Sequence, residues 1–536
     1  MAKNNRGLAG QLVEISWEVC NPVGGIHTVI RSKTKTACDR WDDNYLLLGP
    51  WVHSDAEVEV LPLPLPDNAI GIALKQLQEA GFKVLYGRWQ VAGHPQVVLF
   101  SLNELWPQLD EIKTRLWYDH HVPCGNISEN LIEQTILFGH AVFNFLRRLE
   151  KAAPIEPLIA HFHEWMAGLP IPFLRREGSR IQTVFTTHAT MLGRYLAMND
   201  PEFYQHLPFY DWKAEAHNFN IEFQVYLERA AAHGAHHFTT VSEVTADECR
   251  HLLGRPFDFI LPNGLDMGRF SVGHELQNLH RQCRDRLHEF VIGHFFSSYA
   301  FDLDKTLYFF TSGRFEYRNK GFDLTLAALD RLNWKMKLEK LDTTVVMFFI
   351  TPRPCQSINA QVLQSQAIKA NLAQEVRSIQ KELGEKLFLD LATGHTGEIP
   401  DLQNFISDER RMALKRIIKV WKAKGGLPLI CTHILYDDQH DDVLNYLRYH
   451  HLVNLAEDRV KIIYHPDFIT PQSPLGVQDY QSFVRGCHLS LFPSYYEPGG
   501  YTPLESMACG VATAASDLSG FGRYVQSNFP GSEKKC

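Results

Sequence analysis

Short apolar runs recur along the whole chain, and each is followed by a turn and then by a helical pattern. Runs of this length, rich in β-branched and aromatic residues, indicate strands that are buried on both faces of a parallel sheet. Two sets of such strands alternate with helices, which predicts an α/β fold of two doubly wound domains. The runs lie at residues 12–19, 96–102, 157–163, 182–188, 236–242, 306–315, 343–351, 460–465 and 487–494.

The join between the two domains is predicted near residues 261–266, where Pro-Asn-Gly gives a strong turn signal. This divides the chain into an N-terminal domain of residues 1–270 and a C-terminal domain of residues 271–536. Within the second domain, the segment from about 356 to 425 is charged and amphipathic over long stretches, which predicts a helical insertion. Two interpretations of the insertion stay open: a self-association element, or a peripheral helical pair of the same chain.

The charge of the chain argues against a nucleic-acid partner. Its net charge is −8, from 53 basic and 61 acidic residues, and it has no basic tract. Its 10 cysteines form no CxxC pair, which argues against a zinc site and a disulfide framework and suits a reducing compartment. No apolar run reaches the roughly 18 residues of a membrane span, and the N-terminus is a poor signal peptide. These features predict a soluble cytoplasmic protein without a membrane partner.

A glycine pair, Gly24-Gly25, stands between the first predicted strand and the helix that follows it. Glycine lets the backbone approach an anion closely, and the start of a helix offers free N–H groups to that anion. The surrounding residues form neither a Walker A motif nor a GxGxxG fingerprint, so a nucleoside triphosphatase or a dehydrogenase is not favoured. A tight turn without a ligand explains the pair equally well.

Histidines gather at the ends of two predicted strands. His161 and His163 point to one face of their strand, but no third ligand stands at a useful spacing, so no metal is expected and hydrogen bonds within the fold are the better interpretation. His188 ends the next predicted strand and could donate a hydrogen bond to a sugar hydroxyl. Arg194 follows six residues later and could face a phosphate.

Two cations follow another strand end. Arg314 and Lys320 lie between a predicted strand and an apolar-periodic helix, where they could neutralise a diphosphate. A solvated charged loop is an equally good interpretation, because Glu316 and Arg318 stand between them.

The stretch SYYEPGGYTPLESMACG, at residues 494–510, contains two glutamates and a glycine pair. Thr502, Pro503 and Glu505 fit a capping box, with Thr502 as the N-cap of a helix. This does not account for Glu497 or for the Gly-Gly pair before the helix. The exposed N–H groups there predict a second anion site, beside a carboxylate that could accept hydrogen bonds from sugar hydroxyls.

Several of these segments resemble glycogen synthases of the animal and fungal type, which form glycosyltransferase family 3. The resemblance runs in order from about residue 10 to 525. It implies a GT-B fold, with two Rossmann-like domains facing a cleft, and a retaining hexosyltransferase that uses no metal or other cofactor. It also implies UDP-glucose as donor and the non-reducing end of glycogen, or another α-1,4-glucan, as acceptor. The matching segments are EVCNPVGGIHTV, IAHFHEW, VFTTHATMLGRYL, LPNGLD, GRFEYRNKGFD, EDRVKIIYHPDF, DYQSFVRGCHLSLFPSYYEPGGYTPLES and LSGFGRYV.

The resemblance assigns a role to each candidate residue of the C-terminal part. Glu497 would lie beside the transferred glucose, and Glu505 would hold the ribose hydroxyls. Arg314 and Lys320 would stabilise the diphosphate as its bond to glucose breaks. Tyr480 would stack on the uracil. The backbone of Gly500, Tyr501 and Thr502 would complete the phosphate cradle.

The N-terminal domain would supply His188 toward the sugar, Arg194, and the close approach of Gly24 and Gly25 to the donor phosphates. The helical insertion matches the region through which members of this family form tetramers, so a homo-oligomer is expected.

The chain departs from the family pattern in two places. Gly499 stands where the family has a tryptophan, and the family continues beyond LSGFGRYV, so a truncated C-terminus without the arginine-rich regulatory helix is expected. Two alternatives follow: a catalytically impaired homologue that binds glucan or partners, and the same reaction with ADP-glucose. Bacterial-type synthases carry Lys-x-Gly-Gly where this chain has Pro22 before Val-Gly-Gly, which counts against ADP-glucose.

Overall fold

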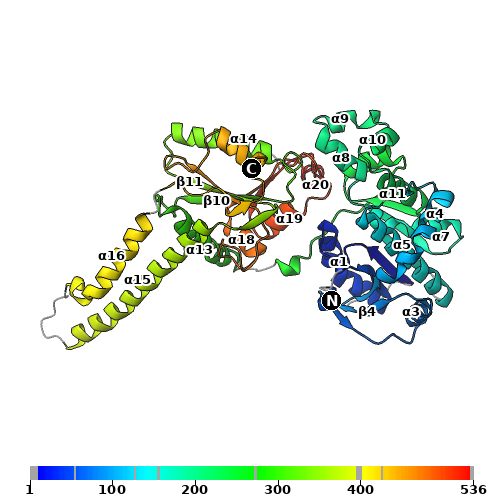
Figure 1. The fold of residues 1–536 in the computed structure, drawn as a ribbon, viewed down its shortest axis with the longest axis horizontal. Coiled ribbons are helices and arrows are strands. Elements are labelled where there is room, and N and C mark those ends of the chain that lie inside the picture. Colours follow the sequence, from blue (N-terminus) through cyan, green and yellow to red (C-terminus); the bar gives the residue numbers. More distant parts are fainter. Residues whose placement is uncertain are drawn as a thin grey trace. The chain divides into compact units, whose positions relative to one another are not determined.

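The computed structural model describes residues 10–52, 56–125, 128–153, 157–270, 275–393, 401–423 and 426–531. The chain divides into two compact units (Figure 1). The first unit contains Met1–Arg269, Tyr495–Tyr501 and Ser516–Cys536, and the second contains Phe270–Ser494 and Thr502–Ala515. The expected assignment of the whole of 271–536 to one domain therefore differs from the structure in two C-terminal segments.

The first unit is built on a nine-stranded sheet in the order β3-β4-β5-β2-β1-β6-β7-β8-β9. The pairs β3–β4 and β4–β5 are antiparallel, and the others are parallel. The strands are β1 (Gln11–Ser16), β2 (Tyr45–Trp51), β3 (Val60–Pro62), β4 (Val84–Trp89), β5 (Gln96–Ser101), β6 (Leu158–His163), β7 (Gln182–Thr187), β8 (His237–Thr240) and β9 (Phe259–Ile260). The helices are α1 (Gly25–Trp41), α2 (Ala56–Glu59), α3 (Ala69–Glu79), α4 (Leu109–His120), α5 (Asn130–Ala152), α6 (Trp165–Gly168), α7 (Pro170–Arg176), α8 (Met191–Asn199), α9 (Phe203–His206), α10 (Trp212–Asn218), α11 (Glu222–Gly234), α12 (Glu243–Glu248) and α20 (Gly520–Asn528).

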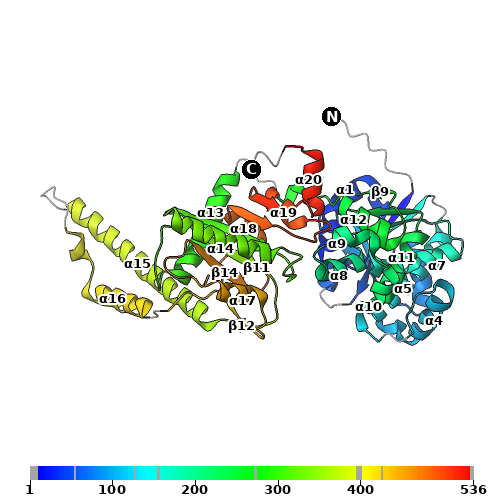
Figure 2. The same ribbon diagram turned by 90° about the horizontal axis from the view of Figure 1, so that it is seen from above.

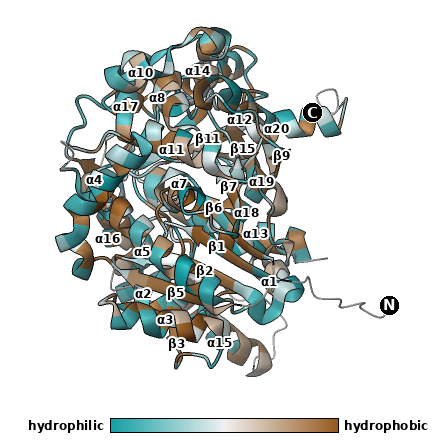
Figure 3. Cartoon of the chain, turned by 90° about the vertical axis from the view of Figure 1, so that its right-hand side faces the viewer, coloured by the Kyte–Doolittle hydropathy of each residue, from teal (hydrophilic) through white to brown (hydrophobic). Residues whose placement is uncertain are grey.

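Both faces of this sheet are buried, which explains the uninterrupted apolar runs. On β2, Leu46 and Leu48 pack into a core with α3 and α5, whereas Tyr45 and Leu47 pack into a second core with α1. Because side chains alternate along a strand, a strand covered on both faces is apolar at most positions, and the polar residues it contains must be paired. Brown, apolar stretches accordingly run through the strands at the centre of the view in Figure 3.

The second unit contains a parallel five-stranded sheet in the order β14-β11-β10-β15-β16. Its strands are β10 (Thr306–Ser312), β11 (Thr344–Ile350), β14 (Val460–His465), β15 (Leu489–Phe492) and β16 (Ala512–Ala515), and β12 (Cys355–Ile358) with β13 (His433–Leu435) forms an antiparallel ribbon. Its helices are α13 (Leu276–Phe295), α14 (Phe322–Leu338), α15 (Ala360–Thr393), α16 (Asp408–Lys422), α17 (Asp442–Tyr449), α18 (Tyr480–Gly486) and α19 (Tyr501–Ala508), of which α19 begins at the unit boundary.

The sheet of the second unit is also covered on both faces. Met347 and Phe349 of β11 pack with α14 and α17. Phe348 points the other way and contacts Phe290 of α13 and Phe483 of α18. Figure 1 shows α14 on one side of this sheet and α13 and α18 on the other. The predicted α/β fold with two Rossmann-like domains is confirmed, and every apolar run named above contains a strand.

Among the strands that the sequence analysis does not name is β2, whose sequence contains the turn signal Gly49-Pro50. In the structure the pairing of β2 with β1 ends at Leu48, whereas its pairing with β5 continues through Pro50, opposite Phe100, to Trp51. Tertiary pairing overrides the local signal here.

The segment predicted as a helical insertion contains the long helices α15 and α16, which lie side by side and extend away from the sheet of the second unit (Figures 1 and 2). Arg410 of α16 bonds Glu375 at 2.9 Å and Glu382 at 2.6 Å, both on α15. Among the described residues, no helix combines the length and apolarity needed to cross a bilayer.

The return of the C-terminal segments to the first unit has a clear packing reason. Tyr496 contacts Phe203 edge-on, at 6.1 Å between ring centroids, and Tyr495 contacts Tyr204 at 5.8 Å. The Tyr495 hydroxyl also accepts a hydrogen bond from the Phe203 N–H and donates to the Pro201 carbonyl. Burial of these rings fixes the segment that contains Glu497 on the first unit.

Candidate active site

Most predicted site residues follow the carboxyl ends of parallel strands, where open α/β sheets bind ligands. His188 and Arg194 follow β7 of the first unit, and Arg314 and Lys320 follow β10 of the second. Each unit therefore has its own group of candidate residues.

The backbone of the His188 loop is held by Glu164, which comes directly after β6. One Glu164 carboxylate oxygen accepts hydrogen bonds from the N–H groups of His188 and Ala189, at 2.9 and 3.0 Å. Glu164 itself has φ of 65°, a conformation uncommon for a residue with a side chain. Burial raises the pKa of this carboxyl, although Arg194 and the two backbone bonds lower it. The loop is therefore anchored by a strained, buried acid.

Two further buried carboxyls hold the same loop. Glu228 of α11 accepts hydrogen bonds from the Thr187 hydroxyl at 2.8 Å and the Met191 N–H at 3.0 Å. Glu248 of α12 accepts from the Thr190 hydroxyl at 2.6 Å and from the Tyr496 hydroxyl at 2.9 Å. Glu248 thus ties the loop that begins α8 to the segment that contains Glu497.

Burial dominates the ionisation of these two acids, because both side chains are fully inaccessible to solvent. Burial raises the pKa of Glu228, and the charge of Glu164 adds to the effect. Burial also raises the pKa of Glu248 to about 7, against hydrogen bonds from Thr190 and Tyr496 that lower it. The acids that support the loop therefore change charge near neutral pH.

The imidazole of His188 contacts a second histidine. Its Nε2 lies 2.9 Å from Nδ1 of His163, whose Nε2 lies 2.5 Å from Oε1 of Glu14 on the neighbouring strand β1. Lys33 pairs with the same Glu14 oxygen, and the Tyr45 hydroxyl donates to the other oxygen at 2.5 Å.

The structure supplies a third group beside the histidine pair on β6. One ligand atom each from Glu14, His161 and His163 lie within 4.8 Å of one another, and Glu14 is in register with His161. The sequence prediction that no third candidate ligand accompanies the pair was therefore wrong, because spacing along the chain does not report neighbours across a sheet. Glu14 is already bonded to Lys33 and Tyr45, and the absence of a metal stays a prediction.

At Gly24 and Gly25 the start of α1 binds a carboxylate from the protein itself. Oε2 of the buried Glu18 accepts hydrogen bonds from the N–H groups of Gly24, at 2.9 Å, and His27, at 2.8 Å. A Cβ atom at Gly24 would lie 2.8 Å from Oε1 of Glu18, so a side chain there would displace this carboxylate. The predicted anion site is an N–H cradle that Glu18 occupies.

Glu497 lies in a turn of the first unit. Its Oε1 accepts a hydrogen bond from the Gly500 N–H at 3.3 Å, and its carbonyl oxygen accepts from the Gly520 N–H at 2.9 Å. Gly500 has φ of +85°, which favours glycine. Tyr501 donates its hydroxyl to the Gly264 carbonyl at 3.0 Å. The turn therefore fixes the backbone of the carboxylate.

The predicted capping box at Thr502 is not what the structure shows. Helix α19 begins at Tyr501, so Thr502 lies inside the helix, where its carbonyl accepts a hydrogen bond from the Ser506 hydroxyl at 2.8 Å. Gly500, whose φ is positive, directly precedes the helix and therefore takes the place that an N-cap residue would have, so Thr502 is not the N-cap.

The candidate cations of the second unit lie in the loop from β10 to α14. Arg314 is ion-paired with Glu316 at 3.2 Å, while its side chain stays 60% exposed. The Lys320 side chain passes over Gly313, where an added Cβ would lie 3.4 Å from it. Gly321 has φ of +67° and packs so closely on the Pro493 carbonyl that no side chain fits there. This glycine fixes the loop against the end of β15.

Tyr480 and Glu505 lie near each other at the carboxyl end of the same sheet. Tyr480 begins α18, and its hydroxyl lies 2.6 Å from the hydroxyl of Ser312, the last residue of β10. Burial has the largest effect on the pKa of Tyr480 and raises it. The hydrogen bond with Ser312 lowers this pKa, and the nearby charge of Glu505 raises it. The half-buried ring of Tyr480 and the carboxylate of Glu505 therefore lie at the same end of the sheet.

Sequence reasoning missed the buried acids that hold these groups. A carboxylate inside or soon after an apolar strand must be paired, because burying an unpaired charge is costly, and this signal could have found Glu14, Glu18 and Glu164 but not Glu228 and Glu248, which lie on helices. The missed residues are Glu14, Glu18, Glu164, Glu228 and Glu248.

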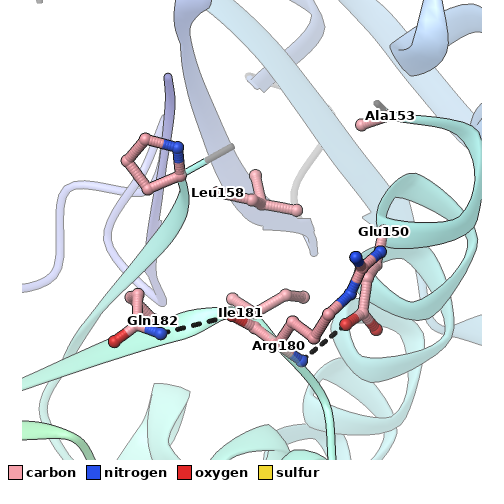
Figure 4. A pocket seen from close by; sticks show the side chains of 7 residues that line it. Glu150, Ala153, Leu158, Arg180, Ile181 and Gln182 are labelled. Carbon is pink, nitrogen blue, oxygen red and sulfur yellow. Dashed lines mark hydrogen bonds between the residues drawn. The ribbon is translucent and has the colours of Figure 1, made fainter. Parts of the chain in front are cut away.

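A pocket of about 540 Å³ lies at the amino ends of strands in the sheet of the first unit (Figure 4). Leu158 begins β6 and Gln182 begins β7, so both lie at the amino ends of their strands. The Arg180 N–H donates to Glu150 beside it. Since ligands of such sheets bind at the carboxyl ends, this pocket is separate from the candidate residues.

We expect Glu248 to make stability depend on pH. Its pKa is about 7 in the folded protein, above the ordinary value of 4.5, so the folded state keeps a proton that the unfolded chain releases. The free energy of unfolding should therefore fall as pH rises from about 4.5 through about 7, on the order of 1 kcal/mol per pH unit from this group. Urea titrations across that range should show that Glu248→Gln removes this slope.

The matched control for this prediction is Glu243→Gln, which changes an exposed acid of the same helix. It should keep the wild-type slope. A Glu248→Gln variant whose pH dependence runs parallel to the wild type would contradict the prediction.

The sequence matches the family model for glycogen synthase over residues 14–535. It is 40% identical over 516 residues to glycogen (starch) synthase of Neurospora crassa and 41% identical over 519 residues to the liver glycogen (starch) synthase of Homo sapiens. Each match covers 96% of this chain and 73% of the relative. Among solved structures, the catalytic domain of starch synthase IV from Arabidopsis thaliana, bound to ADP and acarbose, is 15% identical with a TM-score of 0.48, covering 96% of this chain and 84% of that chain. The chain belongs to the glycogen synthase family.

Proposed function

We propose that the protein is a glycogen synthase that transfers glucose from UDP-glucose to the non-reducing end of an α-1,4-glucan, with retention of configuration. The observation that carries this proposal is the identity of about 40% to glycogen synthases over 96% of the chain. The grouping of the candidate residues at the carboxyl ends of parallel strands supports it, because ligands of such folds bind there.

The proposed roles follow the chemistry of the leaving group. Departure of UDP leaves an electron-poor anomeric carbon and adds negative charge to the diphosphate. Arg314, Lys320 and the N–H groups at the start of α19 would stabilise that charge, and Glu497 would stabilise the sugar. Because these interactions strengthen as the bond breaks, they lower the barrier rather than only binding the substrate.

The remaining candidate residues would bind and orient the donor. Tyr480 would stack on the uracil and Glu505 would hold the ribose hydroxyls. His188 and Arg194 would contact the sugar and a phosphate from the first unit, and Gly24 with Gly25 would approach the phosphates once Glu18 makes room for them. The reaction is proposed to proceed without a metal or other cofactor and in the cytoplasm.

The donor experiment tests this function directly. The purified chain should incorporate radiolabelled glucose from UDP-glucose into glycogen, and ADP-glucose at equal concentration should give at most a tenth of that rate. Amylase digestion of the product should release the label as α-1,4-linked fragments. A preference for ADP-glucose would favour the alternative donor. Glucan binding without incorporation from either donor would favour a catalytically impaired homologue.

We further propose that α15 and α16 form the surface through which copies of this chain assemble, up to a tetramer. Apolar side chains are exposed along this pair, among them Phe388, at 71% exposure, and Leu389, at 60%. Exposed apolar side chains on one helical pair are typical of contact sites.

Replacing Phe388 with glutamate should therefore lower the oligomeric mass in solution to that of a monomer or dimer, measured by light scattering during gel filtration. Tyr449→Glu, which changes an exposed aromatic residue on α17, should leave the mass unchanged. An unchanged mass for Phe388→Glu would exclude this surface.

A further inference from the structure

Three buried side chains of the first unit form a line of hydrogen bonds that ends at His188. Oε1 of Glu14 lies 2.5 Å from Nε2 of His163, and Nδ1 of His163 lies 2.9 Å from Nε2 of His188. The line crosses three adjacent parallel strands, from β1 through β6 to the end of β7. The rigid sheet therefore fixes the position of each ring.

The direction of these hydrogen bonds follows from the charge of Glu14. Burial would raise the pKa of Glu14, but Lys33 and the bond to His163 lower it well below its ordinary value, so the group is an ionised carboxylate. An ionised carboxylate can only accept hydrogen bonds. His163 must therefore donate from Nε2.

The same reasoning extends through both rings. Burial lowers the pKa of His163 and lowers that of His188 well below its ordinary value, so both imidazoles are neutral. A neutral imidazole has one donor and one acceptor nitrogen. Because His163 donates from Nε2, its Nδ1 accepts, and His188 must donate from Nε2 to it.

The last atom of the line is Nδ1 of His188, which is left as an acceptor. This atom is buried, and within the described part of the chain it has no hydrogen-bond partner. A buried polar atom without a partner is uncommon in proteins and calls for an explanation such as a bound ligand.

We propose that Glu14 and His163 are positioning residues that hold His188 with its proton on Nε2, so that Nδ1 accepts a hydrogen bond from a hydroxyl of the sugar being transferred. This inference rests on the proposed function. It reverses the sequence expectation that His188 donates to the sugar. Glu14 would thus determine, through His163 and His188, that the group of the ligand facing Nδ1 must be a hydrogen-bond donor.

A metal on Glu14, His161 and His163 would give the opposite result. It would take the lone pair of His163 Nε2, which places the proton on Nδ1. Nδ1 of His163 would then donate to Nε2 of His188, and the proton of the His188 imidazole would lie on its own Nδ1. The tautomer of His188 therefore separates the two arrangements.

The first test reads that tautomer without any activity. In the full chain labelled with 15N-histidine, long-range proton–nitrogen correlation spectra distinguish a protonated Nε2 from a protonated Nδ1, and His188→Asn identifies the signals. We expect His188 with the proton on Nε2, and a shift toward a mixture of tautomers in His163→Leu. A proton on Nδ1, or an imidazolium, would overturn the proposal.

The second test asks whether His163 acts through His188. His163→Leu should lower kcat for transfer from UDP-glucose about tenfold or more. In the His188→Ala background, adding His163→Leu should cause almost no further loss of kcat. His161→Leu is the matched control, because His161 lies on the same strand face but bonds Thr186 instead of His188. It should change kcat less than threefold. A full His163→Leu effect in the His188→Ala background would contradict the proposal.

A third variant separates positioning from packing. His163→Asn can offer an amide oxygen at the place of Nδ1, so it should recover part of the activity that His163→Leu loses, with a similar melting temperature. No recovery would mean that His163 supplies no acceptor to His188. If the wild-type chain transferred no glucose, the proposed function would fail, and the spectra would still decide the tautomer.

Discussion

Replacing Glu497 with alanine is expected to lower kcat for glucose transfer by about 100- to 1000-fold while the protein stays folded. The carboxylate is held by the Gly500 N–H and by the backbone of its turn, so it is already oriented before the donor binds. Preorganised charge of this kind stabilises a cationic sugar centre without further rearrangement. The measurement is the initial rate with UDP-glucose and glycogen, with thermal unfolding recorded on the same sample.

Asp517→Ala provides the control for this variant, because it removes an exposed carboxylate from a neighbouring segment of the same unit. It should leave kcat within twofold of the wild type. Activity of Glu497→Ala within about fivefold of the wild type would contradict the role of Glu497.

The second large effect is expected at the cations of the loop from β10 to α14. Arg314→Ala and Lys320→Ala should each lower kcat/KM about 100-fold, because each removes a donor to the charge that develops on the departing diphosphate. The loss should be greater in kcat/KM than in the affinity for UDP, since the charge on the diphosphate grows in the transition state. Steady-state kinetics and calorimetric titration with UDP give the two quantities.

Arg318→Ala removes a positive charge from the same loop and serves as the control. We expect it to change kcat/KM less than threefold. Equal losses in all three variants would mean that the loop acts through its total charge rather than through two placed donors.

The strands could be predicted because burial on both faces leaves a simple signature. β11 is apolar at nearly every position, and such a run has few other interpretations. β2 was not named, and it contains the turn signal Gly49-Pro50, although it pairs with β5 through both of these residues. Local signals therefore sufficed where no turn signal interrupted the strand and failed where one stood inside it.

The candidate site was predictable only in part for a related reason. Positions after strand ends can be read along the chain, which is how His188, Arg314 and Lys320 were found. The partner of His163 is Glu14, 149 residues away, and their contact depends on β1 pairing with β6. Strand order is a property of the whole sheet, so neither the line of hydrogen bonds nor a third group beside His161 and His163 could be read from spacing.

The division of the first unit along the chain bears on how the protein is made. Residues 270–494 are synthesised before Tyr495–Tyr501, so a nascent chain completes β1 to β9 long before the segment that contains Glu497 exists. Until then Phe203 and Tyr204 lack the tyrosine rings that cover them. Contacts between such distant segments form late and slowly, and uncovered aromatic surface promotes aggregation in the meantime. Chaperones that bind nascent chains are therefore expected to engage this aromatic cluster, and transferase activity to be the last property that the protein acquires.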